Sequence, residues 1–180
     1  EGKGARGVRV LTEKSDRYDL LFNGRPFAKY ISMDELKSTV GEKEIPELMV
    51  MEYLEGVELK IDPVLQKGEI LTCSVKNRLN FASGLAMGFE MIKDDKALEY
   101  TKKLLEHLPM DYCIDISTRG GVLMEINPRV STYIYSENYC APYLALKLAM
   151  EEMSADEVKD YQKKLPIGKK MFRYYGQIDY

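Results

Sequence analysis

Hydrophobic and polar residues alternate most regularly between positions 57 and 78, and this period of two predicts a pair of β-strands. The first strand has two distinct faces, with Glu58, Lys60 and Asp62 on one and Leu59 and Ile61 on the other. A second strand, Glu69 to Arg78, follows a turn near Lys67 and Gly68. The sequence therefore predicts a hairpin with one polar face.

Weaker signals predict the elements before this hairpin. Ser32 and Glu35 have the spacing of a capping box, which predicts a helix that runs to about Val40 and ends at Gly41. The apolar run Leu48 to Leu54 predicts a buried strand. Three short strands are expected nearer the N-terminus: Val8 to Leu11, and a hairpin of Tyr18 to Phe22 with Phe27 to Ile31.

The second half of the chain mixes strand and helix signals. Small residues and glycines predict a mobile loop from Asn80 to Gly88. The other expected elements are a strand Phe89 to Ile92, a helix from Asp94 to Pro109, a hairpin of Tyr112 to Thr118 with Val122 to Asn127, helices Ser136 to Met153 and Val158 to Leu165, and a strand Met171 to Tyr175. Antiparallel strands with separate helices predict an α+β fold.

Composition narrows the classes of protein. The 180 residues suit one domain or two small subdomains, and 26 basic against 29 acidic residues give a net charge of −3. This balance argues against nucleic acid as the main partner. No apolar run is long enough for a membrane span, so we expect no membrane partner. Three widely spaced cysteines indicate reduced thiols, and we expect a cytoplasmic protein.

Acidic and amide side chains gather on the hairpin from Asp111 to Arg129. If residues 119–121 form a three-residue turn, Asp115 lies opposite Glu125. One face then holds Asp115, Ser117, Glu125 and Asn127, with Cys113 and Leu123 as its less polar members, and the other holds Ile114, Ile116, Val122, Met124 and Ile126. Hard oxygen donors suit Mg²⁺ completed by phosphate oxygens, and Arg129 lies where a guanidinium neutralises a transferred phosphoryl group. The alternative is an acidic strand face exposed to solvent.

Three further segments suit a nucleotide. Backbone groups of Met51 to Leu54 can bond an adenine edge, and Glu58 can accept ribose hydroxyls. Lys76 and Arg78 share a strand face that can neutralise polyphosphate, while residues 2–7 form a glycine loop before a strand. The alternatives are an exposed glutamate, a solvated basic face and a plain flexible turn.

Taken together, these segments resemble the ATP-grasp superfamily, most closely the ATP-binding domain of the carbamoyl-phosphate synthase large subunit and its smaller relatives. Four stretches carry the resemblance in the family's order: the glycine loop at residues 2–8, Glu52 to Glu58, Glu125 to Ser131, and the apolar helix Ala141 to Ala149. The stretch Glu125-Ile126-Asn127-Pro128-Arg129 is the most specific of them.

The resemblance implies an ATP-grasp fold, in which two small α+β subdomains grip ATP. Residues 1–54 would belong to the smaller, nucleotide-binding subdomain and residues 55–180 to the larger C-terminal one. Because the chain begins inside the glycine loop, we expect it to be incomplete. An N-terminal substrate domain or a homo-oligomer would supply the missing part.

The resemblance also implies a function, namely an ATP-dependent carboxylate–amine ligase that forms an acyl phosphate. The implied Mg²⁺ or Mn²⁺ ligands are Asp115, Glu125 and Asn127, and Arg129 is the implied catalytic residue. The implied ATP contacts are Gly4, Gly7, Met51, Glu52, Leu54, Glu58, Lys76 and Arg78. A catalytically inactive nucleotide-binding regulatory module is the alternative.

Overall fold

The computed structural model describes residues 8–16, 18, 30–45, 47–82, 85–133, 135–172, 174 and 176, without the side chains of 80–82 and 85. The glycine loop with Gly4 and Gly7, and most of the predicted hairpin between residues 18 and 31, lie outside these ranges. Internal contacts divide the chain into two units, residues 1–53 with 82–85 and residues 54–81 with 86–180. Each unit is described by itself.

The first unit contains two short strands and one helix. β1 (Val10–Leu11) pairs in parallel with β2 (Tyr30–Ile31). α2 (Met33–Val40) begins at a capping box, since the Ser32 hydroxyl accepts from the Glu35 amide and the Glu35 carboxylate accepts from the Ser32 amide. The predicted helix is confirmed.

The segment predicted as a buried strand, Leu48 to Leu54, has no helix or strand and is largely exposed. Met49 is 85% exposed and Val50 is 93% exposed. A strand needs a neighbouring backbone to satisfy its amides, and an apolar run by itself does not provide one. The prediction of a buried strand is therefore wrong.

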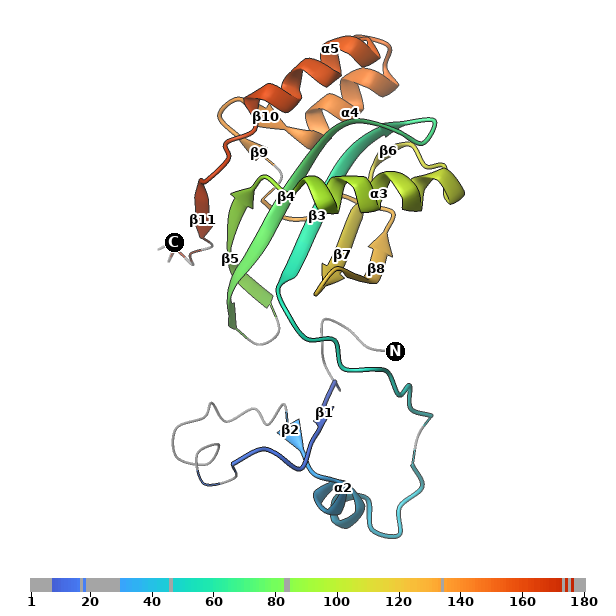
Figure 1. The fold of residues 1–180 in the computed structure, drawn as a ribbon, viewed down its shortest axis with the longest axis vertical. Helices are drawn as coiled ribbons and strands as arrows, with labels where there is room; N and C mark the ends of the chain where they lie inside the picture. Colours follow the sequence, from blue (N-terminus) through green and yellow to red (C-terminus); the bar gives the residue numbers. More distant parts are fainter. Residues whose placement is uncertain are drawn as a thin grey trace, which may run out of the picture. The chain divides into compact units, whose positions relative to one another are not determined.

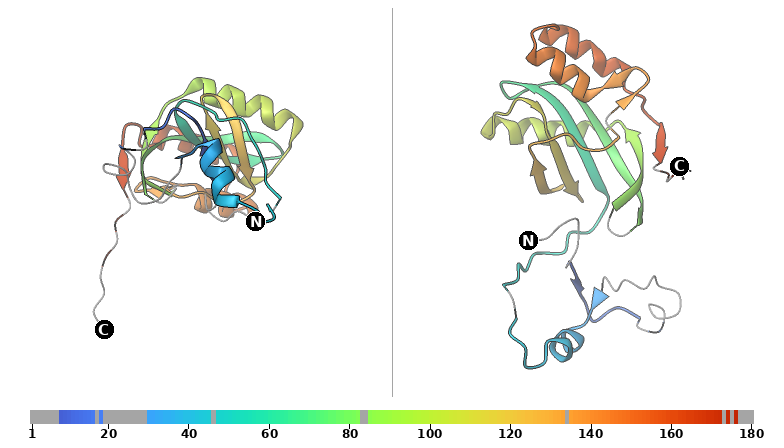
Figure 2. Two further views of the ribbon diagram at one scale, coloured as in Figure 1. Left: turned by 90° about the horizontal axis from the view of Figure 1, so that it is seen from below. Right: turned by 180° about the vertical axis from the view of Figure 1, so that it is seen from behind.

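The second unit is built on an antiparallel sheet, shown in Figures 1 and 2. Its described strands are β3 (Glu58–Gln66), β4 (Glu69–Ala82), β5 (Leu85–Ile92), β6 (Tyr112–Cys113), β7 (Asp115–Arg119), β8 (Val122–Asn127) and β11 (Lys170–Phe172). They lie in the order β11-β5-β4-β3-β7-β8, and β6 also pairs with β3. The predicted β3–β4 hairpin and the α+β class are confirmed.

The loop predicted at residues 80–88 is mostly strand. β4 continues to Ala82 and β5 begins at Leu85, so Gly88 is paired with Phe172 of β11. Glycines and small residues lower strand propensity, but pairing with neighbouring strands overrides that preference here.

Two groups of helices cover the sheet. α3 (Asp95–His107) packs on a core that includes Ile61, Leu65, Val75 and Ile116. α4 (Ala141–Ala149) and α5 (Ala155–Asp160), followed by the 3₁₀ turn η1 (Tyr161–Lys164), pack on a second core around Val64 and Leu71. Because Val64 and Leu65 are neighbours on β3 and belong to different cores, the helices lie on opposite faces.

The helix predicted from Ser136 begins later, at Ala141. A small hairpin precedes it, formed by β9 (Tyr135–Ser136) and β10 (Tyr139–Cys140). Pro142 lies in the first turn, where its missing amide hydrogen costs nothing. No helix in the described ranges has the length and apolar character needed to cross a membrane.

The β7–β8 hairpin differs from its prediction at the turn. Gly120 and Gly121 form a two-residue turn with positive φ at both positions, and Arg119 pairs with Val122. A bulge at Met124 then places Ser117 opposite Glu125 and Asp115 opposite Asn127. The predicted pairing of Asp115 with Glu125 is wrong. The shared face of Asp115, Ser117, Glu125 and Asn127 is confirmed, but Leu123 packs in the core while Met124 is exposed.

Gly120→Ala should destabilise the protein by about 2 kcal/mol, because a Cβ there combines a left-handed φ with overlap on the Glu55 carbonyl oxygen. Gly121→Ala is the matched control, since its φ is also positive but nothing lies within 4 Å of the added Cβ. Its cost should be about 1 kcal/mol. Urea unfolding of both variants measures the difference. Equal costs would contradict the close approach of residues 55–57 to this turn.

Candidate functional site

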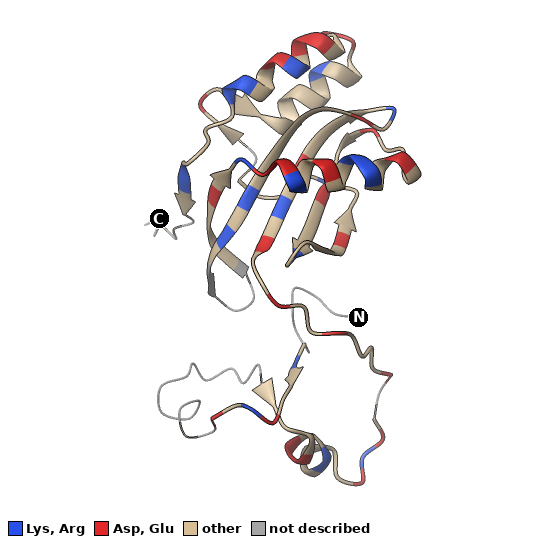
Figure 3. Ribbon diagram, viewed as in Figure 1, with Lys and Arg blue, Asp and Glu red and all other residues tan. Residues whose placement is uncertain are grey.

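Charged and polar residues form rows across the sheet face opposite α3, beyond the part that α4 and α5 cover. One row crosses the sheet from β4 to β8 and consists of Lys76, Lys60, Ser117 and Glu125. Each of these residues lies directly opposite the next one on the neighbouring strand. Ribbons coloured by charge show basic and acidic positions side by side on these strands (Figure 3). This polar face carries five basic and four acidic residues: Lys60, Lys76, Arg78, Arg119 and Arg129 with Glu58, Asp62, Asp115 and Glu125.

Asp115 is the most densely contacted carboxylate of the polar face. Its side chain is 1% exposed. Both carboxylate oxygens lie 3.0 Å from the Lys60 ammonium. The Arg129 guanidinium donates to it at 3.2 Å and the Asn127 amide at 3.4 Å. The strands β3, β7 and β8 thus meet at this carboxylate.

Glu125 lies beside Asp115 but is more open, with 55% of its side chain exposed. Its Oε1 accepts from the Ser117 hydroxyl at 3.1 Å and from the Lys60 ammonium at 3.3 Å. Burial alone would raise the pKa of Glu125, but Lys60, Asn127 and Ser117 outweigh it and lower the pKa below its ordinary value. Glu125 is therefore an ionised oxygen donor at neutral pH.

Glu58, at the start of β3, is held between two arginines. Arg78 from β4 and Arg119 from β7 each bind one of its carboxylate oxygens, the latter at 2.9 Å. Glu58 is 8% exposed. Two guanidinium groups therefore lie together beside the first residue of β3.

Lys76 and Asp62 form a buried ion pair with an N–O distance of 2.8 Å. Lys76 is fully buried, and its ammonium also donates to the Ser131 hydroxyl at 2.9 Å and the Thr132 carbonyl at 2.6 Å. Burial raises the pKa of Asp62, and Lys76 works against that rise. This pair fastens the segment that follows Arg129 to the centre of the sheet.

This arrangement of residues agrees with a family match. A family model described as "ATP-grasp in the biosynthetic pathway with Ter operon" matches residues 44–169, more than two thirds of the chain. The chain belongs to the ATP-grasp family. Membership indicates an ATP-dependent ligase-type function, with ATP, Mg²⁺ and a carboxylate as the general ligands of the family. The closer resemblance to carbamoyl-phosphate synthase is not confirmed, and no curated protein matches the chain.

Seven of the residues predicted for the ATP-grasp site lie on the polar face: Glu58, Lys76, Arg78, Asp115, Glu125, Asn127 and Arg129. Met51, Glu52 and Leu54 lie in the extended segment before β3, which has no regular structure. Gly4 and Gly7 lie outside the described residues. The roles of all these residues stay predictions.

Three residues of the polar face were missing from the predicted site. Lys60 and Asp62 were visible in the sequence, because they alternate with Glu58 on β3. The sequence predicts Arg119 in a three-residue turn, whereas the observed two-residue turn makes it the last residue of β7. Lys60 contacts Asp115 and Glu125, and Arg119 contacts Glu58, at separations of 55 to 65 positions along the chain. No local sequence pattern reveals such distant pairs.

The donor set at Asp115, Glu125 and Asn127 fits a magnesium ion in its chemistry. Carboxylate and amide oxygens are the ligands that Mg²⁺ takes, usually one or two carboxylates plus water and phosphate oxygens. The shared contact of Asp115 and Glu125 with Lys60 shows that their oxygens converge. Across the described ranges, no three His, Cys, Asp or Glu side chains cluster for a metal, so phosphate or water would complete the shell.

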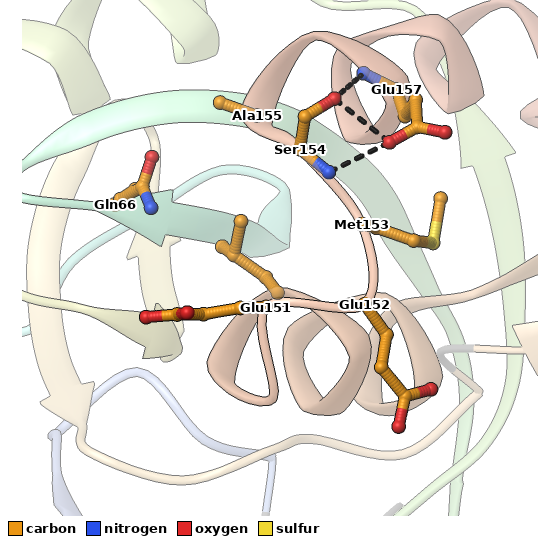
Figure 4. A pocket seen from close by; sticks show the side chains of 8 residues that line it. Gln66, Glu151, Glu152, Met153, Ser154, Ala155 and Glu157 are labelled. Atoms are coloured by element: carbon orange, nitrogen blue, oxygen red, sulfur yellow. Dashed lines mark hydrogen bonds between the residues drawn. The ribbon is translucent and has the colours of Figure 1, made fainter.

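A pocket of about 430 Å³ lies elsewhere, between the end of β3 and the α4–α5 connection (Figure 4). Glu151, Glu152 and Glu157 are among its lining residues, and none of the predicted site residues is. An acidic lining disfavours a polyanion such as ATP. The polar face is therefore the better candidate.

Cys73 and Cys113 are not nucleophiles at neutral pH. Burial raises the pKa of the Cys113 thiol to about 12 and that of Cys73 further, so both are protonated at neutral pH. All three cysteines are free thiols, as the sequence predicts.

Proposed function

We propose that this ATP-grasp protein binds MgATP on the polar face and uses it to join a carboxylate to an amine through an acyl phosphate. The observation that carries the proposal is the convergence of Asp115, Glu125 and Asn127 beside Arg129 on two adjacent strands. A carboxylate cluster alone would repel ATP. The arginines and lysines of the same face offset that repulsion.

Asp115, Glu125 and Asn127 would hold one or two divalent ions. When bound, Mg²⁺ or Mn²⁺ neutralises charge on the phosphates and polarises the transferred phosphoryl group. Arg129 has a side chain that is 60% exposed, so its guanidinium can leave Asp115 and contact the transferred group. We assign it as the catalytic residue.

The remaining contacts to ATP are assigned to three places. Arg78 and Lys76 supply positive charge to the triphosphate, although Lys76 is engaged by Asp62 and residues 131–132. Glu58 binds the ribose, and the backbone of Met51 to Leu54, Glu52 included, binds the adenine. Gly4 and Gly7 cover the phosphates. In this proposal residues 1–54 form part of the smaller subdomain and residues 55–180 the larger one.

The reaction proceeds in two steps. A carboxylate oxygen of the substrate attacks the γ-phosphorus of ATP, and ADP leaves. The amine nitrogen then attacks the carbonyl carbon of the acyl phosphate, inorganic phosphate leaves with the electron pair of the C–O bond, and the amine loses a proton. This scheme needs a carboxylate and an amine but no carbamoyl phosphate chemistry. An N-terminal substrate domain or a second copy would help to bind the two substrates.

Calorimetry with MgATP tests the binding step. We expect saturable heat with MgATP and much weaker heat with ATP in excess EDTA, because the metal would offset the repulsion between the carboxylates and the phosphates. AMP lacks the β- and γ-phosphates, so its affinity should be nearly the same with and without Mg²⁺. A folded protein that gives no heat with MgATP would overturn the proposal.

The second candidate is a regulatory module that binds ATP without chemistry. One observation favours it: Glu58 and Lys76 are both engaged in internal ion pairs. ADP release separates the two candidates. A ligase forms ADP in the presence of its carboxylate, whereas a regulatory module binds MgATP and returns it intact.

A further inference from the structure

Lys60 occupies the point at which the oxygens of the donor set converge. Its ammonium lies 3.0 Å from both oxygens of Asp115 and 3.3 Å from Glu125 Oε1, and it donates to the Ser117 hydroxyl. The side chain is 12% exposed. Lys60 thus offsets part of the negative charge of the two carboxylates that the proposed function assigns to the metal.

An ammonium at this position and a divalent ion compete for the same lone pairs of these oxygens. Mg²⁺ binds carboxylate oxygens at about 2.1 Å, and an ammonium in contact with the same oxygens would be forced against it. Two cations at such a short separation also repel each other strongly. Binding of the metal to these oxygens therefore favours the departure of Lys60 from Asp115 and Glu125.

We propose that Lys60 is a resident cation that the divalent ion displaces, which couples metal binding to nucleotide binding. The proposal rests on the proposed MgATP site. With Lys60 in place, the metal alone binds weakly, because it must first break the contacts of the ammonium. A bound nucleotide favours the exchange, because the released ammonium gains a phosphate as its new partner. Metal and nucleotide then each raise the affinity for the other.

Lys60→Met should bind Mn²⁺ alone about tenfold more tightly than the unmodified protein, as followed by electron paramagnetic resonance. The coupling between Mn²⁺ and ATP should shrink in the same variant. Asp115 keeps its contacts to Arg129 and Asn127, and Glu125 keeps Ser117, so the hairpin retains partners. Lys147→Met is the matched control: Lys147 of α4 pairs with Glu152, which follows the helix, and its loss should leave Mn²⁺ affinity unchanged.

A second measurement needs no variant. Acetylation of the unmodified protein, read by mass spectrometry, should modify Lys60 faster with saturating Mn²⁺ alone than without it, while the rate at Lys147 stays constant. The displacement is refuted if Lys60→Met leaves the Mn²⁺ affinity unchanged, or if Mn²⁺ does not affect the acetylation of Lys60. If the unmodified protein still binds MnATP in that case, the proposed function stands. If the unmodified protein does not bind MnATP, the proposed function itself is refuted.

Discussion

Glu125→Gln is expected to lower the rate of Mg²⁺-dependent ADP formation about a hundredfold or more, while the protein remains folded. Glutamine keeps the size of the side chain and removes the negative charge that the metal requires. Because more than half of the Glu125 side chain is exposed and Ser117 can donate to either residue, the sheet should lose little stability. ADP release with a carboxylate that the unmodified protein accepts measures the rate, and thermal unfolding checks the fold.

Glu99→Gln is the matched control for this experiment. Glu99 is a glutamate of α3, on the opposite side of the sheet, and it pairs with Lys103 at the surface. Its replacement removes the same charge without touching the polar face, so ADP formation should be unchanged. A Glu125→Gln protein that forms ADP at the unmodified rate would contradict the assignment of Glu125 to the metal.

The sequence predicts the polar face well because alternation is a local property. Glu58, Lys60 and Asp62 must share a side of any strand that contains them, and the structure confirms this for β3. The residues that these side chains contact on other strands cannot be predicted from local sequence. Lys60 meets Asp115 and Glu125 only because β7 lies next to β3 and β8 next to β7.

The β7–β8 hairpin shows how one residue changes a prediction. Val122, Met124 and Ile126 alternate as a core face should, but the bulge at Met124 moves Leu123 into the core beside Ile126. The same bulge restores the polar face, so that Glu125 and Asn127 still lie with Ser117 and Asp115. A sequence with Gly120 and Gly121 at the turn is compatible with a turn of two or three residues, and packing decides between them.

The segment Leu48 to Leu54 marks a different limit. Its apolar side chains predict burial, yet burial depends on a covering surface, and Met49, Val50 and Met51 are exposed. The hydrophobic pattern of a segment describes that segment alone and does not say whether another part of the chain covers it. The predicted adenine contacts of this segment therefore rest on the resemblance alone.

Lys76→Met is expected to cost about 3–5 kcal/mol of stability, the largest effect that we predict for folding. The substitution leaves Asp62 as a buried carboxylate without its cation, and removal of one partner from a buried pair is strongly destabilising. It also removes the donor that holds Ser131 and Thr132. Lys163→Met, at an exposed lysine paired with Asp160, is the control and should cost less than about 1 kcal/mol.

The pH dependence of the Lys76→Met variant identifies the carboxylate as the cause. Burial already raises the pKa of Asp62, and without Lys76 nothing on β4 opposes that rise. A carboxyl whose pKa is higher in the folded than in the unfolded state stabilises the fold at low pH, and this contribution is lost as the pH rises through the folded pKa. The gap between variant and unmodified protein should therefore widen from pH 5 to pH 8 in urea unfolding. The double variant Asp62→Leu with Lys76→Met should recover most of the loss and abolish this additional pH dependence, because neither member of the buried pair is left to carry an unpaired charge. A single variant that loses less than about 1 kcal/mol at pH 8 would show that the pair does not hold this part of the sheet together.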